Sequence, residues 1–437
     1  MYQLITIILF VLLIPLGSLS QSILKGKVVD ETGIGIPMAE VYVKDMPELR
    51  VRADLEGNYL MRIELDGEYY LVFQAMGYEP REVFVPIYEG ENTKNIQLFP
   101  VNIKDLDEFS YAVKKTNPGR DIIKRVVEIK DQLDFNQYPY KCDVYIKAKE
   151  ERFDKNRKEE DDVKESNDPY SREQQQKRQK LGNLNNISLV EVELERNYAP
   201  PNNVREFRNA YSKRGNDSRL YYTTTVKSNI NFFKNMLYLN DLSESPIQSP
   251  ISTAGILSYK YRLVEKIERK KQPTLNKIEI TPRNSAVSTL EGFIYVSDST
   301  WMVEKIDLTI VKGNLYIYDY FQIIQEFDTS SDTLCLLKYQ ELNYGVDYRK
   351  EKFKSTTVAN YKNYNFNPDF PPKFFGNEVA VTTKEAYERD SSYWEQSRMT
   401  PLTQEEIAYI KKRDSRISWG NFYLIECRLL FTFNFLY

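Results

Sequence analysis

The sequence contains no histidine among its 437 residues. Histidine is the usual base of serine and cysteine hydrolases and a frequent metal ligand. Its absence excludes Ser-His-Asp and Cys-His catalytic systems and histidine-ligated metal sites. Glycine-rich phosphate and dinucleotide motifs, the G-x-S-x-G elbow and the EF-hand loop are also missing. We therefore assign no catalytic, cofactor-binding or metal-binding residue and expect no cofactor. We expect a protein that is not an enzyme, with a carboxylate-only hydrolase as the low-ranked alternative.

Cysteine is also scarce. Cys142, Cys335 and Cys427 are far apart, odd in number and form no C-x-x-C pair. This pattern disfavours a disulfide framework or a thiolate metal site. We expect buried or free thiols.

Neither sign of charge predominates, because 60 basic residues stand against 63 acidic residues, for a net charge of -3. A nucleic-acid-binding protein needs a basic excess on at least one face, so nucleic acid is not an expected partner. Hydrophobic residues make up 41% of the chain, which is enough for packed cores, and the length allows more than one domain.

The first 20 residues carry no charge and contain an apolar run from Leu4 to Leu16. This run is shorter than the roughly 20 residues that a membrane-spanning helix needs. Ser18 and Ser20 place small residues where a signal peptidase cuts, although no basic residue precedes the run. We predict a signal peptide over residues 1–20, with an uncleaved anchor as the alternative, and an exported protein of the periplasm or outer membrane.

Residues 22–99 contain short segments rich in Val, Ile and Tyr, each bounded by Gly, Pro or Asp, as in a β-sandwich. Five motifs follow one another through them: Gly26-x-Val28-x-Asp30, Pro37-x-Ala39-x-Val41, Asp54-x-x-Gly57-x-Tyr59, Tyr69-x-Leu71-x-Phe73 and Gly77-Tyr78. Together these motifs resemble the carboxypeptidase regulatory-like domain. The resemblance implies a transthyretin-like or Ig-like β-sandwich over residues 22–99, without catalytic residues.

The middle of the chain changes from a helical to a strand pattern. Asn117 and Pro118, followed by apolar residues at helical spacing, predict a helix, which we place in a helical linker over residues 100–138. From Cys142 the apolar period becomes two, and strand patterns continue to about residue 365. We predict a larger antiparallel β-rich α+β domain over residues 139–385, so that the whole chain is mainly β.

Residues 149–180 are dominated by charges of both signs, with few apolar residues. Such a stretch buries too little surface to offset its ordering entropy, so we predict a disordered charged insertion.

Tyrosine is unusually common, with 33 residues. Cross-strand packing is the explanation we favour for these residues, and a sugar- or lipid-facing aromatic surface is the alternative. The residues in question are Tyr259, Tyr261, Tyr316, Tyr318, Tyr361 and Tyr364.

Near the C-terminus, Thr403 and Glu406 form a capping box that predicts a helix within a helical segment over residues 386–420. Beyond it, aromatic residues recur at every second position to Tyr437, as in a strand of an outer-membrane barrel. We interpret residues 421–437 as the start of a barrel or as a non-native tail.

A second set of motifs is spread over residues 22–420. It comprises Tyr140-Lys141-Cys142-Asp143-Val144-Tyr145-Ile146-Lys147, Ser249-Pro250-Ile251-Ser252, Gly292-Phe293-Ile294-Tyr295-Val296, Tyr393-Trp394-Glu395-x-x-Arg398 and Pro401-Leu402-Thr403-x-x-Glu406. In this order they are similar to an uncharacterised Gram-negative envelope family, which joins the sandwich to a domain of unknown function and an outer-membrane β-barrel. By this resemblance the chain looks like a truncated member.

The resemblance implies a non-enzymatic cell-envelope protein with a structural or binding role. Its expected partners are outer-membrane or envelope components, with lipid or glycan as further candidates. The alternative is a carrier whose open β-sheet holds a lipid or another ligand. A carrier needs an apolar cavity of roughly 300–1,000 Å³, whereas a scaffold fills that face with its own side chains.

Overall fold

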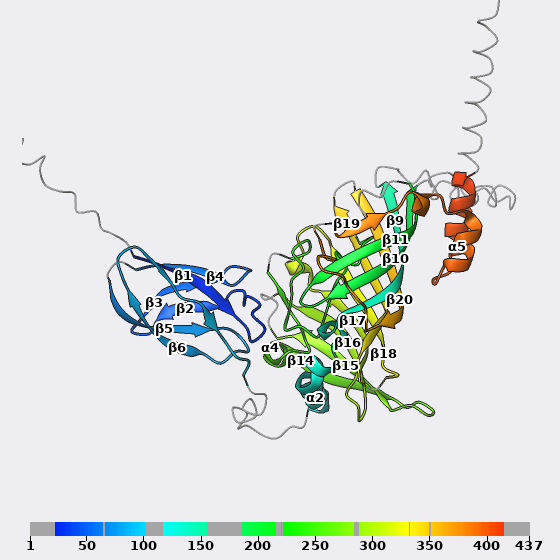
Figure 1. Cartoon of the computed structure of the whole chain (residues 1–437). Coiled ribbons are helices and arrows are strands. Elements are labelled where there is room, and N and C mark those ends of the chain that lie inside the picture. The colour runs from blue at the N-terminus through cyan, green and yellow to red at the C-terminus, as the bar shows by residue number, and fades with distance from the viewer. Residues whose placement is uncertain are drawn as a thin grey trace, which may run out of the picture. The chain divides into compact units, whose positions relative to one another are not determined.

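The computed structural model describes residues 22–63, 66–101, 117–154, 186–215, 220, 222–243, 245–283, 288–331, 333–348, 351–376 and 378–414. The predicted signal peptide at 1–20 and the predicted barrel start or tail at 421–437 lie outside these residues. The chain divides into two compact units, Met1–Val113 and Lys114–Tyr437. Both are built mainly from β-strands, as Figure 1 shows, which confirms the predicted fold class.

The first unit consists of two sheets packed face to face around one apolar core. One sheet has the order β4-β1-β7, with β8 also paired to β1, and the other has the order β3-β2-β5-β6. The strands are β1 (Ser22–Val29), β2 (Glu40–Val43), β3 (Met46–Arg52), β4 (Asn58–Ile63), β5 (Gly67–Gln74), β6 (Arg81–Ile87), β7 (Glu91–Thr93) and β8 (Ile96–Gln97). Residues at every second position, such as Tyr59, Met61 and Ile63 on β4, are buried between the sheets.

The second unit is organised around one sheet of eleven strands, in the order β14-β15-β16-β17-β18-β19-β20-β9-β10-β11-β21. All neighbours are antiparallel except β11 and β21. The strands are β9 (Tyr140–Asp154), β10 (Ile187–Ala199), β11 (Asn203–Arg214), β14 (Tyr259–Ile267), β15 (Leu275–Pro282), β16 (Leu290–Ser297), β17 (Val303–Ile310), β18 (Tyr320–Asp328), β19 (Leu336–Tyr348), β20 (Glu351–Asn365) and β21 (Ala380–Thr382).

We call one face of this sheet the inner face. It is defined by a row of directly paired residues that runs across six strands: Ile306, Gln325, Gln340, Ala359, Ile146 and Val192. The chain between β11 and β14 lies against this face. Its residues 222–243 and 245–258, which we call the inner segment, include helix α4 (Thr253–Ser258) and the short pair β12 (Met236–Leu237) and β13 (Ile247–Gln248).

Side chains of the sheet hold the inner segment by its backbone. The Gln325 amide donates a hydrogen bond to the Ile230 carbonyl at 2.7 Å, and the Gln340 amide donates one to the Ser228 carbonyl at 3.0 Å. Apolar contacts accompany these bonds, such as the edge-to-face pair of Phe233 and Phe327. The inner face is thus covered by the chain itself.

Helix α2 (Pro118–Leu133) begins where the sequence predicts, because the Asn117 side chain accepts a hydrogen bond from the Arg120 amide. Its apolar stripe, however, is buried within the second unit. Gly119 lies so close to β14 that an added Cβ would sit 2.7 Å from the Leu263 nitrogen, and the Lys130 ammonium donates to the Phe233 carbonyl at 2.6 Å. The assignment of this helix to a linker over residues 100–138 is therefore wrong. It covers the edge strand β14, where an exposed edge would invite pairing with another chain.

The charged insertion begins later than predicted. Strand β9 continues to Asp154, and residues 149–154 pair with both β10 and β20 as far as Glu151 and with β20 beyond it. The prediction of disorder from residue 149 is wrong here, because neighbouring strands pair with these residues and ion pairs offset the charge of Lys149: one with Glu151 on the same strand and one with Glu405. Residues 155–180 of the predicted insertion lie outside the described residues.

In the part of the chain that the structure describes, no helix combines the length and the apolar character that crossing a membrane would require.

Gly26 offers a direct test of the sandwich. A Cβ at this position would lie 1.8 Å from the carbonyl oxygen of Lys94, a backbone atom that also accepts a hydrogen bond from the Tyr59 hydroxyl. We expect Gly26→Ala to reduce the free energy of unfolding of this unit by about 3 kcal/mol, since the backbone must shift.

The matched control is Gly67→Ala, because the nearest atom to its added Cβ would be a Tyr69 ring carbon at 3.6 Å. We expect this variant to change stability by about 0.5 kcal/mol or less. Hydrogen exchange of peptides from residues 22–101 in increasing urea measures the first unit separately. Equal stability of the two variants would contradict the packing described.

Candidate docking site on the outer face of the large sheet

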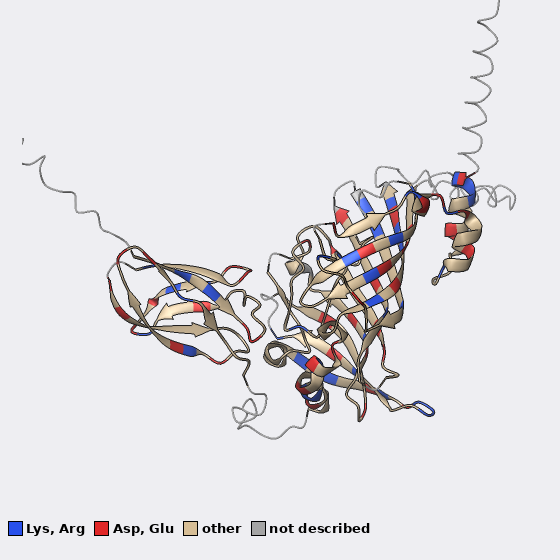
Figure 2. Ribbon diagram, viewed as in Figure 1, with Lys and Arg blue, Asp and Glu red and all other residues tan. Residues whose placement is uncertain are grey.

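The face opposite the inner face, which we call the outer face, carries charged and aromatic side chains on β9 and β10. Figure 2 shows basic and acidic positions interspersed along these strands. Residues 390–414, which we call the outer segment, lie against them. The outer segment contains helix α5 (Ser391–Ser397) and a second helix over residues 404–414.

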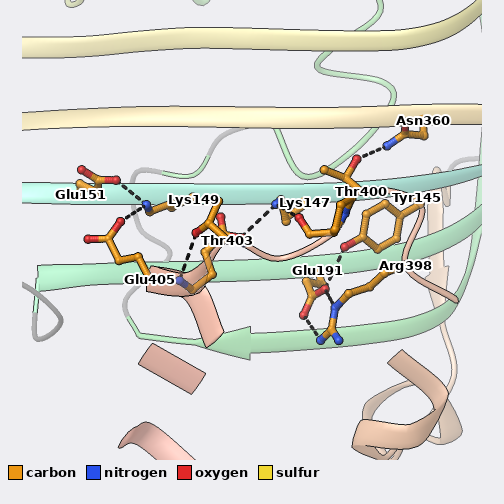
Figure 3. Close-up of polar contacts among 12 residues, drawn as sticks. Tyr145, Lys147, Lys149, Glu151, Glu191, Asn360, Arg398, Thr400, Thr403 and Glu405 are labelled. Atoms are coloured by element: carbon orange, nitrogen blue, oxygen red, sulfur yellow. Dashed lines mark hydrogen bonds and ion pairs between the residues drawn. The ribbon is translucent and has the colours of Figure 1, made fainter. Parts of the chain in front are cut away.

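Arg398 of the outer segment binds Glu191 of β10 with two hydrogen bonds (Figure 3). Its Nε lies 2.7 Å from Oε1 and its Nη2 lies 3.0 Å from Oε2. The Tyr145 hydroxyl of β9 donates a third bond to Oε1 at 2.8 Å. Burial, followed by the effect of Glu191, raises the pKa of Tyr145, so its hydroxyl keeps the proton that it donates. The fully buried carboxylate of Glu191 is therefore bonded from two elements.

Lys147 of β9 and Glu406 form the second buried ion pair, with 3.0 Å between Nζ and Oε2. The exposed fractions of the two side chains are 8% and 4%. Glu406 also accepts a bond from the Thr403 amide, while the Thr403 hydroxyl accepts one from the Glu406 amide. The predicted capping box is thus confirmed, and its carboxylate both caps a helix and fixes that helix to the sheet.

Two apolar clusters flank these ion pairs. Trp394 is buried against Tyr145 and Ala210, and Tyr409 is buried against Ile187 and Leu189. Buried ion pairs add little net stability, but each becomes costly when one partner is lost. The arrangement therefore specifies where the outer segment binds. Because it packs within the second unit, the predicted boundary between a 139–385 domain and a separate 386–420 segment is wrong for the described residues.

The inner face holds a second polar cluster, centred on the buried Arg196 of β10. Its guanidinium donates to the Tyr140 hydroxyl at 3.2 Å and to the Thr225 hydroxyl at 2.6 Å. Thr225 in turn donates from its amide and hydroxyl to Glu206 of β11, at 2.6 and 2.5 Å. A cavity of about 20 Å³ adjoins Arg196 and has room for about one water molecule. This cluster fixes the inner segment to the sheet.

The cysteines of the described part are not activated. Cys142 and Cys335 are free and buried, and burial raises the pKa of each thiol to about 12. Both stay protonated at neutral pH, so neither is a ready nucleophile or metal ligand. Cys427 lies outside the described residues. Within the described ranges, no group of three or more cysteine, aspartate or glutamate side chains is placed to hold a metal ion.

The tyrosines considered for a sugar- or lipid-facing surface are mostly packed inside. Tyr259 and Tyr261 are buried, and their hydroxyls donate to the carbonyls of Gln248 and Pro250, each at 2.7 Å. Tyr318 and Tyr361 are also buried, and Tyr364 donates to the Leu337 carbonyl. Tyr316 alone among the six is exposed, at 58%. Packing, the favoured explanation, is confirmed for the buried members.

The ion pairs of the outer face could not be predicted from the sequence, because their partners are far apart along the chain. Lys147 and Glu406 are separated by 259 positions, and Glu191 and Arg398 by 207. The capping box gave a local reason for Glu406, but the acidic residues of β10 alternate with apolar ones like the solvated face of any strand. Two charged residues become a buried ion pair only when the fold brings them together, so the residues next to each one in the sequence do not reveal the pair.

Two families match the chain. The CarboxypepD_reg-like domain matches residues 24–110, and the family of unknown function DUF5686 matches residues 122–364. A comparison with curated proteins finds no match.

Three solved structures illustrate the structural likenesses. A 3-chlorocatechol 1,2-dioxygenase from Rhodococcus opacus is 13% identical with a TM-score of 0.15; the match covers 18% of this chain and 60% of the dioxygenase, less than two thirds of its length. A LolA superfamily protein from Nitrosomonas europaea is 12% identical with a TM-score of 0.22, over 58% of this chain and 97% of its own. A domain from Vibrio parahaemolyticus, described as an outer membrane lipoprotein-sorting protein, is 8% identical with a TM-score of 0.25, over 59% and 95%. Likenesses this low carry no argument about this chain.

The neighbouring residues Glu405 and Glu406 allow a buried ion pair to be compared with a partly exposed one. We expect Glu406→Gln to cost about 3–5 kcal/mol of unfolding free energy, because it leaves the Lys147 ammonium buried without a counter-charge. Glu405 pairs with Lys149 but is half exposed, so Glu405→Gln should cost less than about 1 kcal/mol.

Urea unfolding of both variants, followed by tryptophan fluorescence, measures the difference, since Trp394 is buried beside the site. The glutamine of Glu406→Gln can still accept the Thr403 amide bond, so the loss reports the charge rather than the cap. Equal costs for the two variants would show that the Lys147 pair is not buried in solution.

Proposed function

Because the chain belongs to DUF5686, a family of unknown function, and carries a CarboxypepD_reg-like domain before it, we propose that it is a non-enzymatic cell-envelope protein with a structural or binding role. The second unit is its rigid body. It holds the inner segment on one face and the outer segment on the other.

The observation that carries this proposal is the filled inner face. Gln325, Gln340 and Arg196 each donate hydrogen bonds to the inner segment, and the cavity left beside Arg196 is about 20 Å³. A lipid or drug-sized ligand needs several hundred cubic ångströms. The packing therefore favours a scaffold over a carrier.

The bonding of the buried charged side chains also supports a non-enzymatic role. Lys147, Glu191, Arg196 and Glu406 are buried, and the bonds described above fix each of them to another element of the same unit. Enzymes hold such groups at a cleft, where their protonation can change during a reaction. Here they join strands to the segments that cover them.

The proposed envelope location rests on the sequence of residues 1–20. An apolar run of this length, followed by small residues and then by a strongly hydrophilic chain, is typical of an exported protein. The partners of such a protein are envelope components, reached through contact surfaces rather than an interior cavity.

A carrier remains the alternative only if the inner segment leaves the sheet. That movement would break the bonds of Gln325 and Gln340 and expose the apolar inner face, including Ile306 and Ile323. Such exposed apolar surface is unfavourable unless a ligand replaces the segment.

Native mass spectrometry of protein isolated from its host envelope tests both parts of the proposal. We expect a protein whose N-terminus lies near Gln21 and which carries no lipid. The same sample mixed with a phospholipid serves as the control for detection. A lipid bound at one copy per chain would contradict the scaffold. A terminus still at Met1 would contradict cleavage and favour the uncleaved anchor.

A further inference from the structure

A recess of about 390 Å³ opens at one end of the large sheet. Its lining comes from three turns and the strands beside them, and Arg269, Thr300 and Asp328 mark the three turns. The turns join β14 to β15, β16 to β17 and β18 to β19. Because consecutive strands of an antiparallel meander reverse direction, alternate turns emerge at the same end, which brings these three together.

The backbone of two of these turns is unusual. Lys271, Ser299 and Trp301 have φ values of 63°, 70° and 57°, in the left-handed region that residues with side chains rarely adopt. They account for three of the six such non-glycine residues in the described chain, all within two turns beside one recess. Strain of this kind gathers at ligand sites, where the structure around it maintains the conformation.

The recess is built on a fixed ion pair. Arg269 binds Glu304 of β17 with two bonds, at 2.6 and 2.8 Å, and also donates to the Pro273 carbonyl at 2.9 Å. This ion pair fixes the first turn to β17, the fourth strand of the meander. A pocket whose walls are held in this way is largely formed before a ligand arrives, which reduces the entropy cost of binding.

The charges that line the recess cancel. Arg269 and Lys338 are balanced by Glu304 and Asp328. Hydrogen bonds from Ser330, with Lys338 nearby, keep the pKa of Asp328 below its ordinary value, so its carboxylate is ionised at neutral pH. A neutral lining of this kind attracts no net charge but offers strong donors and acceptors.

The remaining polar groups of the lining are hydroxyls and one amide, and Pro273 and Phe327 supply its apolar part. The hydroxyls belong to Ser297, Thr300, Thr329 and Ser330, and the amide belongs to Gln272. The buried ring of Phe327, which packs edge-on against Phe233, supplies the aromatic part. Hydroxyls, an ionised carboxylate and an ammonium are the partners that a ligand with many hydroxyl groups needs.

We propose that this recess binds an uncharged sugar, either free or at the end of an envelope glycan. Its volume lies at the lower end of the range for small-molecule sites, which suits one or two sugar rings. This inference goes beyond the proposed scaffold role and does not depend on it, because the recess shares Phe327 with the cavity beside Arg196 but is otherwise lined by other residues.

Ligand-observed saturation-transfer NMR on the purified full chain tests the site. The probes are glucose and N-acetylglucosamine as free sugars, and maltose and chitobiose as glycan ends. We expect saturation transfer to at least one of them. Thr300→Val removes a lining hydroxyl, and Lys338→Ala removes a lining ammonium. Each should weaken binding about tenfold.

Lys260→Ala is the matched control, since Lys260 is an exposed lysine at the start of β14, at the opposite end of that strand from Arg269. It should bind like the unchanged protein. Binding of the disaccharides alone would identify a glycan end as the ligand. No transfer to any probe, or transfer that survives both recess variants, would overturn the proposal. The lipid-free scaffold would stand in either case.

Discussion

Hydrogen bonds from side chains of the large sheet to the backbone of the inner segment are the interaction on which the second unit depends. An open sheet of eleven strands has an extensive apolar face that something must cover. The inner segment has only one short helix and one short strand pair, so it brings other backbone carbonyls into the interior, and each of these needs a donor. Gln325, Gln340 and Arg196 supply donors from the sheet itself.

The two faces of the sheet solve different problems with different chemistry. On the inner face, two amides and one guanidinium bind backbone oxygen atoms, the buried Glu206 carboxylate accepts from Thr225, and apolar side chains pack around these groups. On the outer face, complete ion pairs join the sheet to the outer segment, with Glu191 and Lys147 as the buried partners. A buried charge is costly unless its oppositely charged partner is in place. These pairs therefore determine where the outer segment binds the sheet more than they add to stability.

Local signals in the sequence predict much of the fold and little of the site. The cap at Asn117, the capping box at Thr403 and the alternation from Cys142 all mark elements that the structure contains. Strand β3 has only a weak signal in the sequence, because its side chains are mostly exposed and several are charged. Residues 149–154 form a charged strand because they pair with β10 and β20 and because Lys149 binds Glu405, 256 positions away; local composition shows neither contact.

One signal of the interior was present in the sequence. Gln325 stands in phase with Phe321, Ile323 and Phe327, and a polar residue within an apolar stripe points to a buried hydrogen-bonding role. Its partner Ile230 lies 95 positions away, so the sequence could not identify what it binds. The ion pairs of the outer face share this limit.

The bonds of Gln325, Gln340 and Arg196 make the inner segment a permanent part of the core. Hydrogen-exchange mass spectrometry of the native protein measures this directly, because amides exchange only when their bonds open. We expect peptides from residues 224–258 to exchange as slowly as those from β18 and β19, with opening free energies close to that of global unfolding. Much faster exchange of the inner segment than of these strands would show that the segment leaves the sheet and that the inner face opens to a ligand.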